Sequence, residues 1–474
     1  MKCFLSRTLV MLVLITIFAM FDCIAVAEEK DKPHLILIKN VNVWDGTSDT
    51  VKQDQDVLVE GNKIKQVARN LEVDGAIVID GKGGTVTPGL IDMHQHLTLN
   101  GGTSAGTYDW DAYVQGAHAA RAAEYLLECG FTTLRDIGGN TLGLKRAINS
   151  GKLPGPRIYS SGPAIGPTGG HSDWGSFNDA PGDGNYQTKV VNTIVVDGVD
   201  GWLQSCRWVF RNGGDFIKVM SGGGVASVFD PLELNSPSLS EMKAAVQVAN
   251  EYNSYVAIHG YTDAAYNKSL DAGVKSFEHG FLISEDTVKR MAGEGVWWSW
   301  QPYGSYNTFG KGNFPEWFTP DMMEKGALVA KGSIQVPKWM KKHGVKIFLG
   351  SDMFGWDNWK NAIVNVTYPV EIPDSPFTSV EALKLSTSAS GQALRELTAP
   401  SRNPFKAAKL GVVEPGAWAD LLIWKGDPTK DIRHILEKDN LLFIMKDGKS
   451  YKNLLVPVTH GAYRDCPKPP VYSW

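Results

Sequence analysis

The sequence predicts an α/β fold: a parallel (β/α)8 TIM barrel with a small β-sandwich built from both chain ends. Three observations predict it. The 474 residues suffice for one large barrel and a smaller module. Short apolar strands alternate with helical patterns over residues 86–400, as is typical of parallel α/β folds. Residues 34–85 and 405–460 instead contain strand-like runs separated by turn signals. An open, doubly wound sheet is the alternative architecture for the central region.

The composition excludes several classes of protein. Hydrophobic residues make up 43% of the chain and charged residues 21%, which are the proportions of a globular protein and not of a disordered one. The 47 Lys and Arg residues against 51 Asp and Glu residues give a net charge of −4. This balance offers no basic field for nucleic acid or for an anionic membrane. We therefore expect a small molecule as the partner.

Residues 1–27 have the pattern of a secretory signal peptide. Lys2 and Arg7 precede an apolar run from Leu9 to Phe21, and a small-x-small cleavage site follows at Ala25-Val26-Ala27. The run is shorter than the ~20 residues of a membrane-spanning helix, and an uncleaved anchor is the alternative. We expect an exported protein, periplasmic or secreted, with no membrane segment after signal cleavage.

The two ends of the chain share a β character that predicts one small domain. Near the start, Asp56–Glu60 and Lys63–Val67 flank Gly61-Asn62, which predicts a hairpin with a two-residue turn. Near the end, the apolar run Leu441–Lys446 precedes a second turn signal, Asp447-Gly448. Because chain termini commonly lie close together, we expect both ends to pair into one β-sandwich.

Eight short apolar segments between these ends are the expected barrel strands. They are the segment before His94 and the runs Thr132–Ile137, Arg157–Ser161, Phe216–Met220, Val256–Ile258, Ser276–Glu278, Val296–Trp300 and Lys346–Leu349. Helical stretches intervene. One of them, Leu239–Tyr252, follows the capping-box pattern of Ser238 and Glu241.

Four of the ten histidines fall at the carboxyl end of a predicted strand: His94, His96, His259 and His279. In a barrel, active sites form at that end, because the loops there converge on one mouth. His94 and His96 also lie on the same face of an extended segment, since side chains repeat every two residues. Two neutral imidazoles on one face can bind a divalent metal. Taken singly, each histidine is more readily explained as an ordinary strand-end residue, but four at one mouth favour a metal site.

Lys218 and Asp352 complete this pattern. Lys218 lies within the apolar strand Phe216–Met220, where an ammonium group is costly unless it is paired or modified. The alternative is a lysine that reaches the surface. Asp352 follows the last barrel strand, and its alternative role is a helix N-cap.

The motifs around these residues resemble those of the amidohydrolase superfamily. Thr87–His96 resembles the family's entry motif, and the segments around His259, His279 and Asp352 resemble its later motifs in the same order. The resemblance covers residues 34–455. The most similar branch contains exported imidazolonepropionase-like hydrolases, among them Xaa-Pro dipeptidases and Arg/Lys carboxypeptidase-like enzymes.

This resemblance implies a site with two divalent metal ions, with zinc as the expected metal. His94, His96 and Asp352 would hold the first ion, and His259 and His279 the second. Lys218, carbamylated by carbon dioxide, would bridge the two ions. A carbamate is a carboxylate equivalent, so it suits two cations ~3.5–4 Å apart and removes the problem of a buried ammonium. Asp352 would also be catalytic, as a general base and then a general acid.

The function implied is hydrolysis of the C–N bond of a dipeptide or an N-acyl amino acid by a metal-activated hydroxide. A lactonase or phosphotriesterase-like hydrolase with the same binuclear site is the alternative enzyme. A third alternative is a binding protein that kept the fold but lost catalysis, although none of the six ligands is replaced. The resemblance also favours a homo-oligomer.

Substrate contacts are the least defined part of the prediction. By resemblance, His171 and Tyr261 would bind the substrate carbonyl or carboxylate, with ordinary loop structure as the alternative. Arg135 would either meet a substrate carboxylate or pair with Asp136 or another acid. The aromatic residues Trp297–Trp300 and Tyr303 suggest an apolar or aromatic acyl group. The segment Met353–Trp359 departs from the glycine-rich segment expected of the family, which leaves the exact substrate open.

Overall fold

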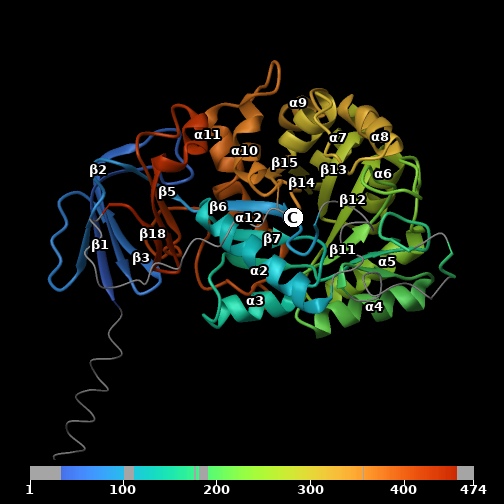
Figure 1. Cartoon of the computed structure of the whole chain (residues 1–474), viewed down its shortest axis with the longest axis horizontal. Coiled ribbons are helices and arrows are strands. Elements are labelled where there is room, and N and C mark those ends of the chain that lie inside the picture. Colours follow the sequence, from blue (N-terminus) through green and yellow to red (C-terminus); the bar gives the residue numbers. More distant parts are fainter. Residues whose placement is uncertain (1–33, 101–110, 176–177, 181–190, 356, 456–474) are drawn as a thin grey trace, which may run out of the picture.

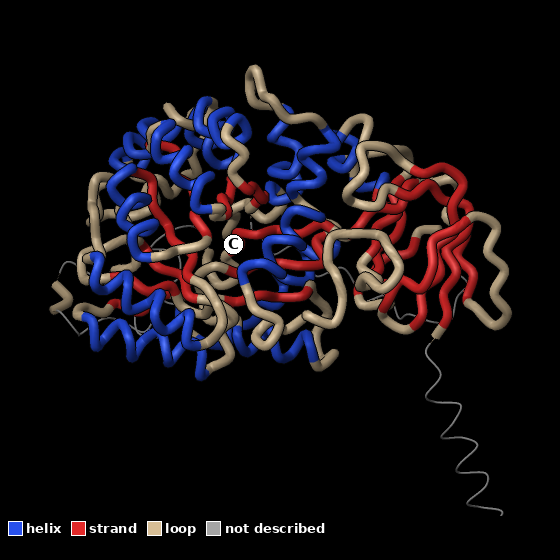
Figure 2. Tube along the Cα trace, turned by 180° about the vertical axis from the view of Figure 1, so that it is seen from behind, coloured by secondary structure: helices blue, strands red, loops and turns tan. Residues whose placement is uncertain are grey.

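A sheet built from both chain ends lies beside a larger body of parallel strands and helices (Figure 1). The computed structural model describes residues 34–100, 111–175, 178–180, 191–355 and 357–455. The predicted signal peptide, residues 1–27, lies outside the described residues. Seen from behind, in Figure 2, the chain-end sheet stands clear of the helices, which gather around the parallel strands. No helix among the described residues is long and apolar enough to cross a membrane.

The chain-end sheet has eight strands in the order β18-β17-β16-β5-β1-β2-β3, with β4 paired to β1. Its strands are β1 (Leu35–Val43), β2 (Lys52–Glu60), β3 (Lys63–Ala68), β4 (Ile77–Asp80), β5 (Thr85–Pro88), β16 (Leu421–Trp424), β17 (Leu441–Lys446) and β18 (Lys449–Asn453). The antiparallel pair of β5 and β16 joins the two ends of the chain, with Leu421 opposite Pro88. These pairings place the strands in one sheet, and the two-layered sandwich stays a prediction.

Turn chemistry fixes the hairpin between β17 and β18. Asp447 and Gly448 both have positive φ values, 56° and 71°, as a two-residue type I′ turn requires. A side chain at position 448 would also collide with the backbone carbonyl of Gly61, because a Cβ there would lie 1.9 Å from that oxygen. This turn therefore needs glycine for its backbone conformation and for its close approach to the β2–β3 hairpin.

The central body contains only parallel strand pairs, in one sheet of three strands and one of seven. The first sheet contains β6 (Leu90–Gln95), β7 (Phe131–Asp136) and β8 (Arg157–Ser160). The second contains β9 (Ala164–Gly166), β10 (Thr193–Val195), β11 (Ile217–Met220), β12 (Val256–Thr262), β13 (Ser276–Leu282), β14 (Trp297–Trp300) and β15 (Lys346–Leu349). Each of the eight predicted strands is present. The sequence analysis missed β9 and β10, which have three residues each.

Backbone hydrogen bonds connect both edges of the three-stranded sheet, β8 and β6, to the seven-stranded sheet. The Asp215 N–H donates to the Ser160 carbonyl at 2.8 Å, next to β8 and β11. At the other edge, the Asp352 N–H donates to the His94 carbonyl at 2.7 Å, next to β15 and β6. The strand order and these two connections are consistent with the predicted (β/α)8 barrel.

Helices follow most of the parallel strands and cover them on the outside (Figure 1). They are α2 (Ala112–Glu128), α3 (Leu142–Asn149), α4 (Val199–Arg211), α5 (Leu239–Glu251), α6 (Asp263–Ala272), α7 (Glu285–Glu294), α8 (Pro320–Ala330), α9 (Gln335–Lys342), α10 (Asn361–Thr367), α11 (Ser379–Leu385) and α12 (Ser388–Leu397). Shorter helical segments are the π-helix η2 (Tyr303–Gly310) and the 3-10 helices η3 (Tyr368–Val370), η4 (Ile432–Leu436) and η5 (Lys438–Asn440). The predicted capping box of Ser238 and Glu241 starts α5.

Successive side chains around β11 alternate between two cores, one that faces the outer helices and one that lies among the parallel strands. Ile217 and Val219 belong to the large core that includes buried residues of α4 and α5. Phe216 belongs to a second core with Ala257 and Phe348, which come from β12 and β15. Because side chains alternate in a strand, Lys218 shares the interior side with Phe216. Its side chain is therefore directed among the strands and not toward the outer helices.

Arg157, on β8, joins the parallel strands to the chain-end sheet. Its Nε donates to Oδ2 of Asp420 at 2.9 Å, and one of its terminal nitrogens donates to Asp447 at 2.9 Å. The guanidinium also lies 4.0 Å from the centre of the Trp418 ring. The Arg157 and Asp420 side chains are only 5% and 4% exposed. Removing one charge would therefore leave the other buried and unpaired.

We expect Arg157→Met to lower the free energy of unfolding by ~3–5 kcal/mol, the usual effect of removing one partner of a buried ion pair. Urea denaturation at fixed metal concentration measures this effect. Arg433→Met is the matched control, since Arg433 pairs with Asp431 at the surface, and it should leave the free energy of unfolding nearly unchanged. Equal effects of the two variants would contradict the role of Arg157 at the junction.

Candidate functional site

The carboxyl ends of the parallel strands bring all eight predicted site residues to one cavity of about 220 Å³. His94 lies on β6 and His96 follows that strand. Lys218 lies on β11, His259 and Tyr261 on β12, and His279 on β13, while Asp352 follows β15. His171 comes from the loop between β9 and β10. Residues separated by more than 250 positions in the sequence thus line the same space.

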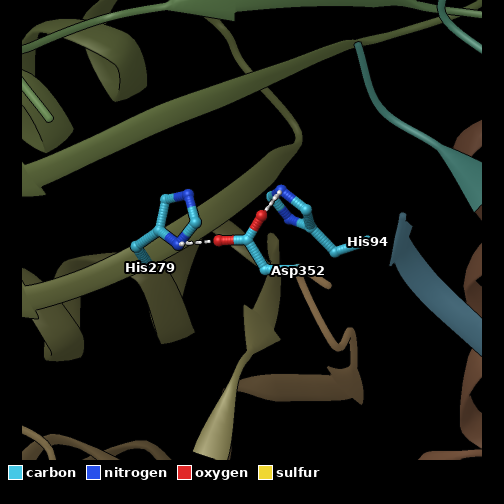
Figure 3. A group of neighbouring side chains, drawn as sticks. All are labelled: His94, His279 and Asp352. Atoms are coloured by element: carbon cyan, nitrogen blue, oxygen red, sulfur yellow. Dashed lines mark ion pairs between the residues drawn. The ribbon is translucent and has the colours of Figure 1, made fainter. Parts of the chain in front are cut away.

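Asp352 lies between the imidazoles of three histidines. Its Oδ1 is 3.2 Å from Nε2 of His96 and 3.4 Å from Nε2 of His94. Its Oδ2 is 4.0 Å from Nδ1 of His279. Figure 3 shows the carboxylate of Asp352 directed at both His94 and His279. One ligating atom each from His94, His279 and Asp352 lies within 4.8 Å of the others, a spacing that could hold a metal ion.

His259 extends this group on the side away from His94. Its ring centre is 4.6 Å from that of His279 and 4.2 Å from that of His171, on which it stacks. Tyr261 packs against His279 with 5.2 Å between ring centres. The histidines therefore form a continuous row across the cavity, with Tyr261 along one side.

Three of the imidazoles have one ring nitrogen tied to the protein. Nδ1 of His94 donates to Glu278 at 2.8 Å, and Nδ1 of His96 donates to the Gly138 carbonyl at 3.2 Å. Nε2 of His259 donates to the Gly223 carbonyl at 3.2 Å. Each ring then keeps its second nitrogen as an acceptor, which is the arrangement that metal-ligating histidines usually have. The donor set therefore fits divalent cations.

Burial determines the charge of these groups. It lowers the pKa of His94 to about 4 and holds the pKa values of His259 and His279 well below their usual value. These rings are thus neutral near pH 7, as metal binding requires. Burial raises the pKa of the Asp352 carboxyl, but its contacts with the imidazoles of His94, His96 and His279 outweigh this effect and hold that pKa below its usual range.

Lys218 lies in the same interior and is 1% exposed. Burial lowers the pKa of its amine to about 8, although the carboxylates of Glu278 and Asp352 act in the opposite direction. A larger share of the amine is therefore neutral at neutral pH than for a lysine at the surface. A neutral amine is nucleophilic, so this environment favours chemical modification of Lys218.

Glu278 is a functional residue that the sequence analysis did not single out. Its Oε2 accepts from His94, and its Oε1 accepts from a terminal nitrogen of Arg135 at 2.6 Å. Both Arg135 and Glu278 have fully buried side chains. Arg135 therefore pairs with an acid other than Asp136 and does not line the cavity. The signal in the sequence was a glutamate within an apolar strand directly before His279, where an unpaired carboxylate would be costly.

Asp230 is a second residue that supports the site and was not predicted from the sequence. Nδ1 of His171 donates to its Oδ2 at 3.0 Å and also lies 2.9 Å from Oγ of Ser227. The Gly224 N–H donates to the same oxygen of Asp230 at 2.6 Å. From α8, Nζ of Lys325 donates to three carbonyls of this loop, which fixes its path. The loop thus orients His171, whose ring lines the cavity.

The tryptophans of β14 do not contribute to the cavity. Trp297, Trp298 and Trp300 form the strand itself and are at most 4% exposed within the core. They are absent from the described lining, so their expected role in substrate binding is wrong. Tyr303 does line the cavity, and so do Met353 and Phe354 from the segment that departs from the family pattern.

Comparison with known proteins finds hydrolases of similar sequence and fold. A curated relative, ochratoxinase of Aspergillus niger, is 27% identical over 383 residues, which are 77% of this chain and 75% of the relative. The crystal structure of a prolidase in complex with N-methylphosphonate-L-proline has a TM-score of 0.79 and 28% identity, and the match covers 88% of this chain and 100% of that chain. A Xaa-Pro dipeptidase with bound methionine has a TM-score of 0.75 and 27% identity, with the same coverage.

The family model described as "Amidohydrolase family" matches residues 85–451, which include every strand and helix that contributes to the cavity. This match spans well over half of the sequence. The chain therefore belongs to the amidohydrolase family.

Proposed function

We propose that this protein is a metal-dependent hydrolase that cleaves the amide or peptide C–N bond of a dipeptide or an N-acyl amino acid. The observation that carries the proposal is the convergence of six ligating side chains at one cavity: His94, His96, Lys218, His259, His279 and Asp352. The neighbours that are named prolidase and dipeptidase support a substrate of this class. The fold that we propose for this activity is a (β/α)8 barrel, with the site at its mouth.

Two divalent metal ions, with zinc as the expected metal, complete the proposed site. His94, His96 and Asp352 would hold the first, and His259 and His279 the second. When bound, such ions lower the pKa of a coordinated water toward ~7 and polarise a substrate carbonyl. The neutral imidazoles and the ionised carboxylate described above are the protonation states that this binding needs.

Lys218 would bridge the two ions as a carbamate. The neutral amine attacks carbon dioxide through its nitrogen, and loss of one proton leaves an anionic carbamate on Nζ. The lowered pKa of Lys218, about 8, supports this step because it supplies the neutral amine. The modification also replaces a buried cation by an anion beside two cations, which removes the cost of burying the ammonium.

Asp352 would move the proton during the reaction. Its carboxylate accepts the proton of the attacking water and then delivers it to the nitrogen of the leaving amine. The pKa of Asp352 lies below the usual range, so the group starts in the ionised form that a base requires.

His171 and Tyr261 would hold the substrate. Because Asp230 accepts the Nδ1 proton of His171, Nε2 of that ring is left to meet the substrate carbonyl or carboxylate. Burial raises the pKa of Tyr261 well above its usual value, so its hydroxyl stays protonated and can donate a hydrogen bond. These two side chains would orient the scissile bond toward Asp352.

Two further proposals concern the whole protein. The leader pattern of residues 1–27 supports export to the periplasm or the medium. A homo-oligomer is proposed from the resemblance alone, and size-exclusion chromatography with light scattering tests it.

The direct test of the function uses the chain without residues 1–27, freed of metal by a chelator and then reloaded with zinc. A panel of dipeptides, N-acyl amino acids, lactones and phosphotriesters is assayed before and after reloading. We expect zinc-dependent cleavage of at least one amide substrate. Zinc-dependent cleavage of only lactones or phosphotriesters would replace the proposal by its alternative, and inactivity toward all classes would reject it.

Asp352→Asn tests the proton transfer. We expect kcat to fall ~10²–10⁴-fold, since general acid–base catalysis contributes about that much, while the metal content measured by mass spectrometry stays high. Asp374→Asn is the matched control, because the side chain of Asp374 is 90% exposed. A near-normal kcat for Asp352→Asn would remove the proposed role.

Lys218→Ala tests the bridge. Without the carbamate, we expect the metal content to fall well below two ions per chain and most activity to be lost. Added acetate or formate should restore part of both, because a small carboxylate can occupy the space of the carbamate. Lys346→Ala, at the partly exposed start of β15, serves as the control. Full metal content in Lys218→Ala would contradict the bridging role.

Glu278→Gln tests the support of His94. This variant keeps the size of the side chain but removes the charge that Arg135 and His94 face. We expect zinc affinity to fall ~10–100-fold, as is typical when the hydrogen-bonding partner of a metal-bound histidine is lost. Competition with a chromophoric chelator measures the affinity directly, and circular dichroism checks the fold. Glu285→Gln, at the surface contact with Lys342, should retain the affinity of the unmodified protein.

A further inference from the structure

A wall of aromatic rings runs from His96, one of the proposed metal ligands, along the cavity. Phe354 packs against His96 with 5.9 Å between ring centres, and Trp317 lies 6.0 Å from Phe354. Phe318 follows at 4.4 Å from Trp317, and Phe314 lies 5.6 Å from Phe318. All five residues line the cavity. The wall is therefore continuous with the proposed metal site.

The rings of this wall are not fully covered by the protein. Phe309, Phe314, Trp317 and Phe354 are each half-buried, in contrast to the β14 tryptophans. A half-buried aromatic ring at a concave surface leaves apolar area that a ligand can cover, and such rings dominate the binding energy of small-molecule sites. The wall thus packs against the core on one side and leaves apolar area open to the cavity on the other.

The backbone around the wall is shaped to hold these rings. Phe309 comes from the π-helix η2, and π-helical turns are frequent at functional sites. Helix α8 carries Gly326 opposite the rings. A Cβ at that position would lie 2.8 Å from the ring of Phe314 and 3.1 Å from that of Phe309. The glycine thus lets both rings pack against α8 and leaves the cavity open in front of them.

The described lining of the cavity contains a single ammonium or guanidinium group, that of Lys218. Lys218 lies among the proposed metal ligands and is not one of the rings of the wall. As a carbamate it would carry a negative charge. The rest of the described lining contains neutral polar side chains, among them Thr308, Asn313 and Asn358, and the carboxylate of Asp352. A carboxylate seated against this wall would therefore lose its hydration without gaining an ion pair, which is costly.

We propose that the substrate carries an uncharged aromatic or large apolar group beside the scissile amide, and that this group is seated on the wall of Phe309, Phe314, Trp317, Phe318 and Phe354. This inference rests on the proposed function and adds the substrate class. Amides whose flanking groups are small, and amides whose flanking groups are acidic, are the poor substrates.

Two matched substrate series test the proposal with the zinc-loaded protein. In the first, the acyl group of an N-acylglycine is acetyl, phenylacetyl or succinyl. In the second, the amino acid of an N-acetylamino acid is glycine, phenylalanine or aspartate.

We expect the aromatic member of at least one series to exceed both other members ~10-fold or more in kcat/KM, because filling an apolar pocket contributes on that order. Equal or higher values for the small or acidic members in both series would overturn the proposal while leaving amide hydrolysis intact. Inactivity of every member would reject the proposed function itself.

Two variants of the wall separate its role from folding. Phe314→Ala removes one ring, and Gly326→Ala adds a methyl group that pushes the rings of Phe314 and Phe309 toward the cavity. Both should lower the aromatic-to-acetyl ratio of kcat/KM ~10-fold. Zinc content and circular dichroism verify the site and the fold, and Phe314→Leu replaces Phe314→Ala if the latter does not fold. Tyr451→Ala, on β18 away from the cavity, is the aromatic control. A ratio that stays unchanged in the folded wall variants would overturn the proposal.

Discussion

The burial of the Lys218 amine is the constraint on which the site depends. The side chain lies among the parallel strands and is 1% exposed, where an ammonium group loses its hydration. The chain surrounds it with imidazoles whose pKa values are lowered and with the carboxylates of Asp352 and Glu278. Arg135 already balances Glu278, so the interior needs further cations only if Lys218 becomes an anion. A carbamate on Lys218 would be such an anion, and two metal ions beside it would offset its charge, which supports the metal proposal.

Two of the proposed metal ligands have an unusual backbone conformation. His279 and Asp352 have positive φ values of 70° and 58°, a left-handed conformation that non-glycine residues seldom adopt. Such positions persist where surrounding contacts fix them and are common at active sites. Here the indole of Trp298 donates to the His279 carbonyl at 2.7 Å, and the Asp352 N–H donates to the His94 carbonyl at 2.7 Å. The chain thus directs two side chains into the cavity by bending the backbone within β13 and just beyond β15.

Local pattern predicted the strands, and it also predicted histidines that line the cavity, because both depend on short-range sequence. An apolar run followed by histidine places that histidine on or just after the strand, and β12 and β13 continue for three residues beyond His259 and His279. The contacts that support these residues depend on long-range pairing and were missed. Glu278 meets Arg135 across 143 positions and His94 across 184, and no local period encodes such a meeting. The tryptophans of β14 were misjudged for a related reason, since clustering in the sequence does not tell a strand in the core from a wall of the cavity.

Anomalous X-ray scattering above and below the zinc absorption edge, from crystals of the zinc-loaded protein, tests the central claim most directly. The account predicts two peaks ~3.5–4 Å apart. One would lie ~2.0–2.2 Å from ligating atoms of His94, His96 and Asp352, and the other at the same range from His259 and His279. Electron density for a carbamate on Lys218 would join them. A single peak, peaks outside this cavity, or an unmodified Lys218 beside two ions would contradict it.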